Sequence, residues 1–267
     1  MSSEISIAQR QYLLSQKKHK RTVRIGRCSI CILFLFLWEL TASLGIIDSF
    51  VFSSPSKILI CFFDMVKDGS IFLHIGVTLF ETFVSFAFVL VFSLLFAILL
   101  WSSRKLSETL EPYLVILNSL PKSALAPLLI VWLGANYKTI ILTGMSVAIF
   151  GSILSLHQGF QDVDSDKLKL IQTLGGNKRH ILTKVLIPAN VPRLLSLAKV
   201  NIGLCLVGVI IGEFISSKCG LGYLIIYASQ VFKMDWMLMS IVILCIISMG
   251  LYGLIGFTEK WYQKRMG

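Results

Sequence analysis

The stretch LIQTLGGNKRHILTKVLIP, residues 170–188, lies between long apolar segments and is too polar to cross a bilayer. Leu170, Ile171 and Leu174 share one face of a helix, at spacings i, i+1 and i+4. Gly175 and Gly176 interrupt that period, because glycine is unfavourable within a helix and favours a turn. The first half of the stretch therefore predicts a short amphipathic helix that ends at a glycine turn.

The second half repeats the apolar period after the basic residues of the turn. Ile181, Leu182, Val185 and Leu186 follow the same spacing up to Pro188, which we expect to end the second helix. Periodicity alone is equally compatible with a helix lying on lipid headgroups and with an element that docks on another protein.

The composition of the 267-residue chain indicates a membrane protein. Hydrophobic residues make up 55% of the sequence, charged residues 15%, and the mean hydropathy is +0.80, whereas soluble domains contain about 25% charged residues. The net charge of +11 is common in nucleic-acid-binding proteins, but here Lys and Arg fall between apolar runs. That placement indicates a role in membrane topology and predicts no nucleic-acid partner.

Six apolar runs are candidate membrane spans, each close to the roughly 20 residues that a spanning helix needs. They cover residues 28–48, 75–101, 113–134, 138–157, 194–216 and 236–257. The third run is interrupted by Pro121, Lys122 and Pro127, so we expect it to pack against protein or a water-filled cavity. The fold class predicted is an all-α membrane protein.

The distribution of Lys and Arg predicts the orientation of these spans. With the N-terminus in the cytoplasm, 18 of the 25 basic residues are cytoplasmic, five lie on the opposite side, and two lie within spans. We therefore expect a multi-pass protein with both termini in the cytoplasm and residues 170–188 on the same side.

The spacing of the cysteines and the lack of a nucleotide-binding motif in the sequence argue against an enzyme or a metalloprotein. Cys28 and Cys31 form a C-x-x-C pair with no second ligand pair, and no G-x-x-x-x-G-K-[ST] sequence occurs. No catalytic constellation stands out either. We expect neither a metal nor a cofactor in this chain, and no ATP hydrolysis by it.

The spacing within residues 170–188 resembles the cytoplasmic motif of bacterial ABC importer permeases. In that motif a glycine is followed by nine residues, a branched apolar residue, one further residue and a terminal Leu-Pro, as Gly175, Val185 and Pro188 are spaced here. The Glu-Ala-Ala that precedes the glycine in the family is replaced by Lys169, Leu170 and Ile171, and Ile187 replaces the Leu. Further stretches similar to the nitrate/sulfonate/taurine-type subfamily are SSPSKI (53–58), LPKSALAPLLIVWLG (120–134), PANVP (188–192) and GEFISSKCGLGYLI (212–225).

The resemblance implies a bacterial cell-membrane permease with the type-I importer fold, about six transmembrane helices and a cytoplasmic coupling helix. Two copies would pair, each docked on an ABC ATPase subunit that binds ATP and Mg²⁺, with a substrate-binding protein outside. The chain would comprise a basic cytoplasmic tail (1–27), one permease domain (28–257, coupling segment 165–190) and a C-terminal tail (258–267). The residues expected to contact the ATPase are Leu170, Ile171, Leu174, Gly175, Gly176, Ile181, Leu182 and Pro188.

Polar and ionisable residues within spans are candidates for the translocation pathway or its gating, because they are costly there. They are Glu81, Asn118, Lys122, Asn201 and Glu213. Lys122 is expected to attract an anion, to pair with Glu81, or to extend to the cytoplasmic surface. Glu213 is expected to make a structural or gating contact, and the two asparagines could hydrogen-bond between helices.

The cargo implied by the resemblance is a small sulfonate, taurine or nitrate. The same machinery could instead carry a vitamin precursor or another small heteroaromatic solute. A secondary transporter that works alone is a third reading, in which residues 170–188 would lack a purpose.

Overall fold

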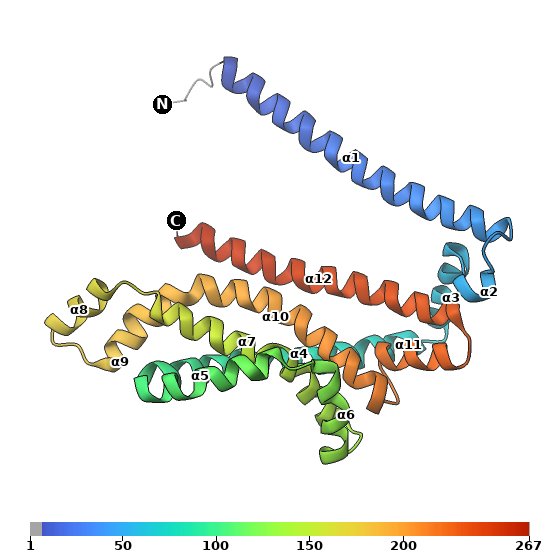
Figure 1. Ribbon diagram of the computed structural model, residues 1–267. Helices are drawn as coiled ribbons and strands as arrows, with labels where there is room; N and C mark the ends of the chain where they lie inside the picture. Colours follow the sequence, from blue (N-terminus) through green and yellow to red (C-terminus); the bar gives the residue numbers. More distant parts are fainter. Residues whose placement is uncertain (1–6, 267) are drawn as a thin grey trace.

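The computed structural model describes residues 7–266, and every regular element within that range is a helix (Figure 1). The elements are α1 (Ile7–Ser43), α2 (Ser49–Phe52), α3 (Pro55–Lys67), α4 (Ser70–Ser102), α5 (Arg104–Ser119), α6 (Lys122–Leu133), α7 (Tyr137–Gln161), α8 (Ser165–Thr173), α9 (Lys178–Ile181), the π-helical turn η1 (Leu182–Leu186), α10 (Ile187–Ser216), α11 (Leu221–Gln230) and α12 (Met234–Met266). The all-α fold class is confirmed.

Five helices are long and apolar enough to cross a membrane, or six when the bent pair α5–α6 counts as one span. The five correspond to the predicted spans 28–48, 75–101, 138–157, 194–216 and 236–257. Several helices run beyond the predicted ends: α1 already begins at Ile7, and α12 continues to Met266. Apolar runs mark the lipid-crossing part of a helix, whereas polar residues that extend the helix into water leave no such signal.

The predicted third span, 113–134, is not one helix. Residues 104–133 form α5 and α6, which meet at an angle of 98° near Leu120 and Pro121. Pro121 has no backbone N–H, and the residue before a proline is disfavoured in the helical conformation. Leu120 accordingly adopts an extended backbone.

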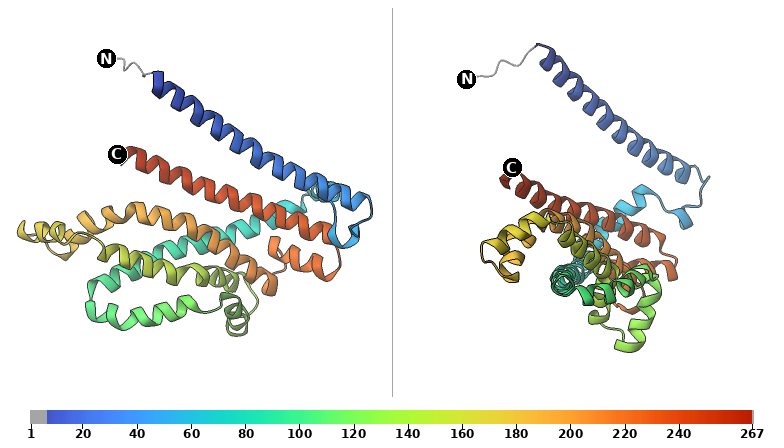
Figure 2. Two further views of the ribbon diagram at one scale, coloured as in Figure 1. Left: turned by 45° about the horizontal axis from the view of Figure 1, so that its top comes forward. Right: turned by 60° about the vertical axis from the view of Figure 1, so that its left-hand side comes forward.

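The centre of the bundle is formed by α4, α7, α10 and α12, which run beside one another in both views (Figures 1 and 2). The packing between α7 and α10 is close because small residues meet there. A Cβ added to Gly208 of α10 would lie 2.8 Å from the Cα of Gly144 and 2.9 Å from the carbonyl oxygen of Thr143. Small residues are the usual means of close helix packing in membranes, where lipid tails remove the hydrophobic drive for association.

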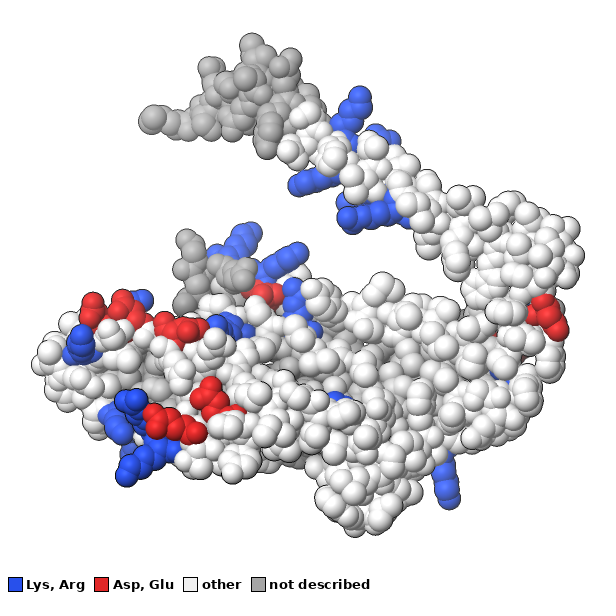
Figure 3. All heavy atoms as spheres, viewed as in Figure 1, with Lys and Arg blue, Asp and Glu red and all other residues white. Residues whose placement is uncertain are grey.

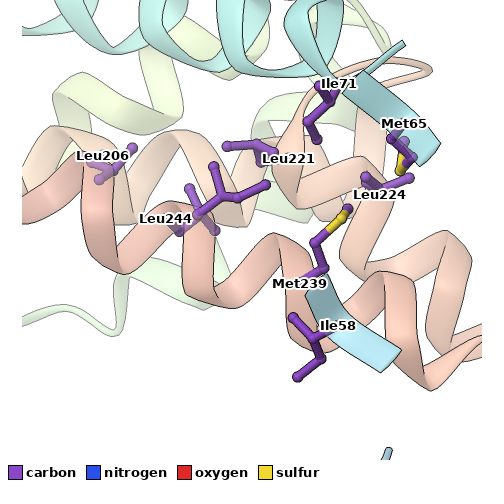
Figure 4. Packing of buried hydrophobic residues seen from close by; sticks show 9 residues of the cluster. Ile58, Met65, Ile71, Leu206, Leu221, Leu224, Met239 and Leu244 are labelled. Atoms are coloured by element: carbon purple, nitrogen blue, oxygen red, sulfur yellow. The ribbon is translucent and has the colours of Figure 1, made fainter. Parts of the chain in front are cut away.

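A cluster of buried apolar side chains attaches the short helices to one end of this bundle (Figure 4). Ile58 and Met65 of α3 and Leu221 and Leu224 of α11 pack against Met239 of α12. The cluster thereby places the segment that follows α10 against α4 and α12.

Helix α1 diverges from the bundle toward its N-terminus (Figures 1 and 2). It is anchored at its C-terminal end, where Ala42 is buried and Glu39 accepts a hydrogen bond of 3.0 Å from the backbone N–H of Ser56 in α3. Glu39, an acid within the first predicted span, therefore helps to join α1 to α3.

Charged side chains gather toward one end of the molecule (Figure 3). Lys, Arg, Asp and Glu surround the α8–α9 end and the C-terminal part of α12, and Lys and Arg lie along the N-terminal part of α1, whereas the middle of the visible face is almost free of charge. The basic segments that the sequence places on one side of the membrane thus lie at one end of the fold.

The α7–α10 contact predicts opposite effects of one substitution at two glycines of the same helix. Gly208→Ala should lower the free energy of unfolding by about 1–3 kcal/mol, because the new methyl group overlaps backbone atoms of α7. Gly203→Ala is the matched control: a Cβ there meets nothing within 4 Å, and alanine favours the helix. Thermal unfolding of the purified variants would measure both, and equal stability of the two would contradict the packing described.

Candidate functional site

The turn between α8 and α9 is built on two glycines that cannot be exchanged for other residues without strain. Gly175 has φ +79°, and its N–H donates to the carbonyl of Gln172 at 3.0 Å. The N–H of Gly176 donates to the carbonyl of Ile171 at 2.8 Å. These two bonds form a Schellman motif, which satisfies the last carbonyls of α8. A Cβ on Gly176 would lie 2.7 Å from the Ile171 carbonyl oxygen.

The second helix of the segment begins at an asparagine cap. The Asn177 side chain accepts a hydrogen bond of 3.1 Å from the N–H of His180, and His180 Nδ1 accepts one of 3.2 Å from the N–H of Asn177. This reciprocal cap fixes the start of α9 immediately after the glycine turn. The predicted pair of short helices joined at a glycine is therefore present, and the cap was the sequence feature that the prediction missed.

The expectation that Pro188 ends the second helix is wrong. The chain continues without a break from α9 through η1 into α10, giving a helical segment from Lys178 to Ser216. The N–H of Ile187 donates to the carbonyl of Leu182, and this wider π-helical turn leads the chain into a helix that has Pro188 in its first turn. Deeper in α10, the Asn190 amide donates to the Leu186 carbonyl at 3.0 Å.

The predicted apolar face of the segment divides into two parts. Ile181 is 3% exposed and packs with Ile171 and Leu182 against buried residues of α4, α7 and η1, so these three hold the segment on its own bundle. Leu170 and Leu174 point away, with exposed fractions of 58% and 75%. The outward apolar surface is therefore smaller than the sequence predicts and centres on Leu170 and Leu174.

An ion pair braces the base of the segment. Arg193 of α10 contacts Asp162, the residue that follows α7, at 2.9 Å. The close approach of Gly159 completes this contact, since a Cβ there would overlap Asn190 and Arg193. The brace joins the ends of α7 and α10 where the α8–α9 segment leaves the bundle.

At the opposite end, Glu213 is fully buried in a polar latch between α10, α4 and the loop before α11. Thr78 Oγ1 donates to Glu213 Oε1 at 2.7 Å, and the Gly222 N–H donates to Oε2 at 2.6 Å. Thr78 in turn accepts a bond of 2.8 Å from the N–H of Leu221, and His74 accepts one of 3.1 Å from that of Gly220. These bonds join Glu213 to α4 and to the start of α11, and no sequence pattern indicated that Thr78 and His74 take part.

Glu81 lies beside Glu213 rather than beside a cation. Its side chain is 3% exposed and interacts with the Glu213 carboxyl group. Two carboxyl groups can hydrogen-bond only when they share a proton. The suggested ion pair between Glu81 and Lys122 is not formed, because neither residue belongs to any ion pair of the described part of the chain.

Lys122 instead lies at the break between α5 and α6. Its ammonium donates to the carbonyl of Leu117 at 2.6 Å and lies 5.3 Å from the centre of the Phe150 ring of α7. Asn118 is close to the same helix: a Cβ on Gly151 would lie 3.1 Å from Asn118 Oδ1. Asn118 and Lys122 thus approach neighbouring residues of α7, Gly151 and Phe150.

Asn201 of α10 is buried and forms a hydrogen bond between helices, which is the kind of contact expected for it from the sequence. Ser152 of α7 donates to Asn201 Oδ1 at 2.9 Å.

Burial raises the pKa of the Cys61 thiol in α3 to about 11, which is typical of an unreactive cysteine. Within residues 7–266 no group of three or more His, Cys, Asp and Glu side chains is arranged to hold a metal ion.

Residues 89–266 match the family model described as "binding-protein-dependent transport system inner membrane component". A probable ABC transporter permease protein of Haemophilus influenzae is 30% identical over 86% of this chain and 92% of its own length. A putative aliphatic sulfonates transport permease protein of Bacillus subtilis is 25% identical over 79% of this chain and 76% of its own.

Relatives with other names match over similar lengths. The riboflavin transport system permease protein of Chloroflexus aurantiacus is 25% identical over 85% of each chain. Among solved structures, a chain of the inward-facing MetNI methionine ABC transporter superposes with a TM-score of 0.62 at 20% identity. The superposition covers 73% of this chain and 94% of the other, and it shows a shared fold.

The latch predicts different effects of valine at two buried threonines one helical turn apart. Thr78→Val removes the donor to Glu213 and the acceptor for the Leu221 N–H, so it should lower the free energy of unfolding by about 1–3 kcal/mol. Thr82→Val is the control, because the Thr82 hydroxyl is equally buried and has no hydrogen-bond partner. Thermal unfolding in detergent would compare them, and a variant at Thr82 as unstable as that at Thr78 would argue against the latch.

Proposed function

We propose that this chain carries a small organic solute inward by alternating access. The chain belongs to the family of binding-protein-dependent transport system inner membrane components and is a permease subunit of an ABC importer. Energy would come from ATP and Mg²⁺ bound on a separate ATPase subunit, and solute would arrive on an extracytoplasmic binding protein. The observation that carries this proposal is the outward apolar surface of Leu170 and Leu174 on a segment that is itself braced to the bundle.

The coupling segment suits a mechanical contact with a motor protein. Leu170 lies on α8 and Leu174 directly follows its end, one turn later. Exposed leucines beside Lys169 and Arg179 would find apolar and acidic partners on a docking protein. Ile181 is buried in the bundle, and α9 continues into α10. A displacement of the exposed turn would therefore move α10 as a rigid body.

A second copy of the chain would cover the broken helix pair. Val131 and Trp132, near the C-terminal end of α6, are 81% and 69% exposed, and α6 itself begins at the 98° break after α5. Irregular backbone is not tolerated against lipid, so this face requires protein or a water-filled cavity beside it. We propose a pair of permeases with the solute pathway between their α5–α6 faces, and the charge distribution supports both termini in the cytoplasm.

The proposed cargo is a sulfonate-type solute, which the names of the Bacillus subtilis relative and of a 22% identical taurine permease protein of Escherichia coli support. A vitamin precursor is the second candidate, because the riboflavin and formylaminopyrimidine permease proteins are of comparable similarity.

Leu174→Asp should abolish co-purification of the permease with its ATPase while leaving membrane insertion intact. The carboxylate would place an unpaired charge in the apolar contact, and burying such a charge is costly. Gln172→Asp adds the same charge on the same turn of α8, about 160° around the helix, and should leave the complex intact. Affinity purification of the tagged permease with its ATPase measures both, and ATPase retention by Leu174→Asp equal to that of the wild type would refute the docking surface.

A further inference from the structure

The ammonium of Lys122 is a positive charge for which the fold supplies no carboxylate. It contacts the Leu117 carbonyl at 2.6 Å and the Phe150 ring, and no ion pair of the described residues includes it. The other lysine within a predicted span differs in this respect. Lys199 lies 3.1 Å from Glu259 and 4.6 Å from the centre of the Tyr252 ring, so its charge is compensated.

Lys122 also lies beside the middle of α7, a helix long and apolar enough to span the membrane. Phe150, which its ammonium approaches, is the fourteenth of the 25 residues of α7. At 1.5 Å per residue, that position is roughly 17–20 Å from either end of the helix. An uncompensated charge at this depth is costly, and such residues characteristically face a water-filled path that serves function.

The ammonium lies where α5 and α6 diverge. The break at Leu120 and Pro121 turns α6 away by 98°, and the Asn118 side chain covers the neighbouring Gly151 of α7, where a Cβ would lie 3.1 Å from Asn118 Oδ1. Asn118 contributes an exposed amide on the same side, near the end of α5. An ammonium and an amide side by side supply N–H donors, which carboxylate and sulfonate oxygens accept.

We propose that Lys122, with the Asn118 amide beside it, binds the anionic group of a small organic anion midway along the pathway. This inference rests on the proposed function and narrows its cargo to solutes that carry a sulfonate or carboxylate group. Glu81 and Glu213 do not pair with this charge: they interact with each other in the latch, and no ion pair of the described residues joins either to Lys122.

Thiol labelling in membranes that contain the whole transporter tests this site even when the natural cargo is unidentified. Ser123→Cys places a thiol on the residue after Lys122. The probes are 2-sulfonatoethyl methanethiosulfonate, which is itself a sulfonate, and its trimethylammonioethyl counterpart. Ser43→Cys, exposed at the end of α1, corrects for the intrinsic reactivity of each probe, and mass spectrometry quantifies each labelled peptide.

The ratio of the labelling rate of the anionic probe to that of the cationic probe should be about tenfold higher at position 123 than at position 43. The nearby positive charge of Lys122 attracts the anionic probe and repels the cationic one. Lys122→Gln should remove this preference, and Lys122→Arg should keep it. A preference unchanged in Lys122→Gln, or a thiol at 123 that neither probe reaches while position 43 reacts, would overturn the proposal. Failure of the proposed function would appear separately, as absence of ATPase co-purification, since the labelling does not depend on the ATPase.

Discussion

The fold depends on one helical backbone that must stay hydrogen-bonded from the α8–α9 turn to the far end of the bundle. Lipid offers no partner for a free N–H or carbonyl group, so a spanning helix has to satisfy its own backbone. The segment from Lys178 to Ser216 stays helical throughout, although Pro188 and Pro192 lack backbone N–H groups. A π-helical turn leads into the first proline, and the Asn190 amide bonds the Leu186 carbonyl.

This continuous helix joins the two polar features of the protein. One end carries the coupling segment, held by Ile181 and by the Arg193–Asp162 brace. The other end carries Glu213, which fastens the helix to α4 through Thr78. Small residues between α7 and α10 allow the two helices to pack closely along the middle of the bundle. Close packing matters there because an apolar helix surface is covered as well by lipid tails as by another apolar helix. In the mechanism we propose, a push on the coupling segment would therefore reach a bundle whose far end is held by hydrogen bonds.

The sequence predicts the elements whose signals are local. Long apolar runs identify five spans, and the spacing from Gly175 to Pro188 identifies both the glycine turn and the family. The direction of the α5–α6 break was not predictable, because prolines show where a helix stops but not where the chain goes next. The prediction for Pro188 was wrong for a related reason, since an open π-helical turn before it keeps the helix continuous.

Contacts between distant residues were the least predictable part of the site. A carboxylate and an ammonium within spans suggest an ion pair, yet Glu81 meets a second acid and Lys122 meets a carbonyl and an aromatic ring. Which leucines face outward was likewise undetermined, because a helical period identifies an apolar face without identifying what covers each part of it. Ile181 turned inward and Leu174 outward within one predicted surface.

The central claim is that the charged α8–α9 end of this permease is the surface that receives the ATPase. Lysine-reactive cross-linking of the transporter purified from its own membranes, read by mass spectrometry, tests this most directly. We predict cross-links to the ATPase from Lys169, Lys178 and Lys184, and none from Lys67 or Lys218 at the other end. ATPase cross-links confined to Lys67 and Lys218 would contradict it.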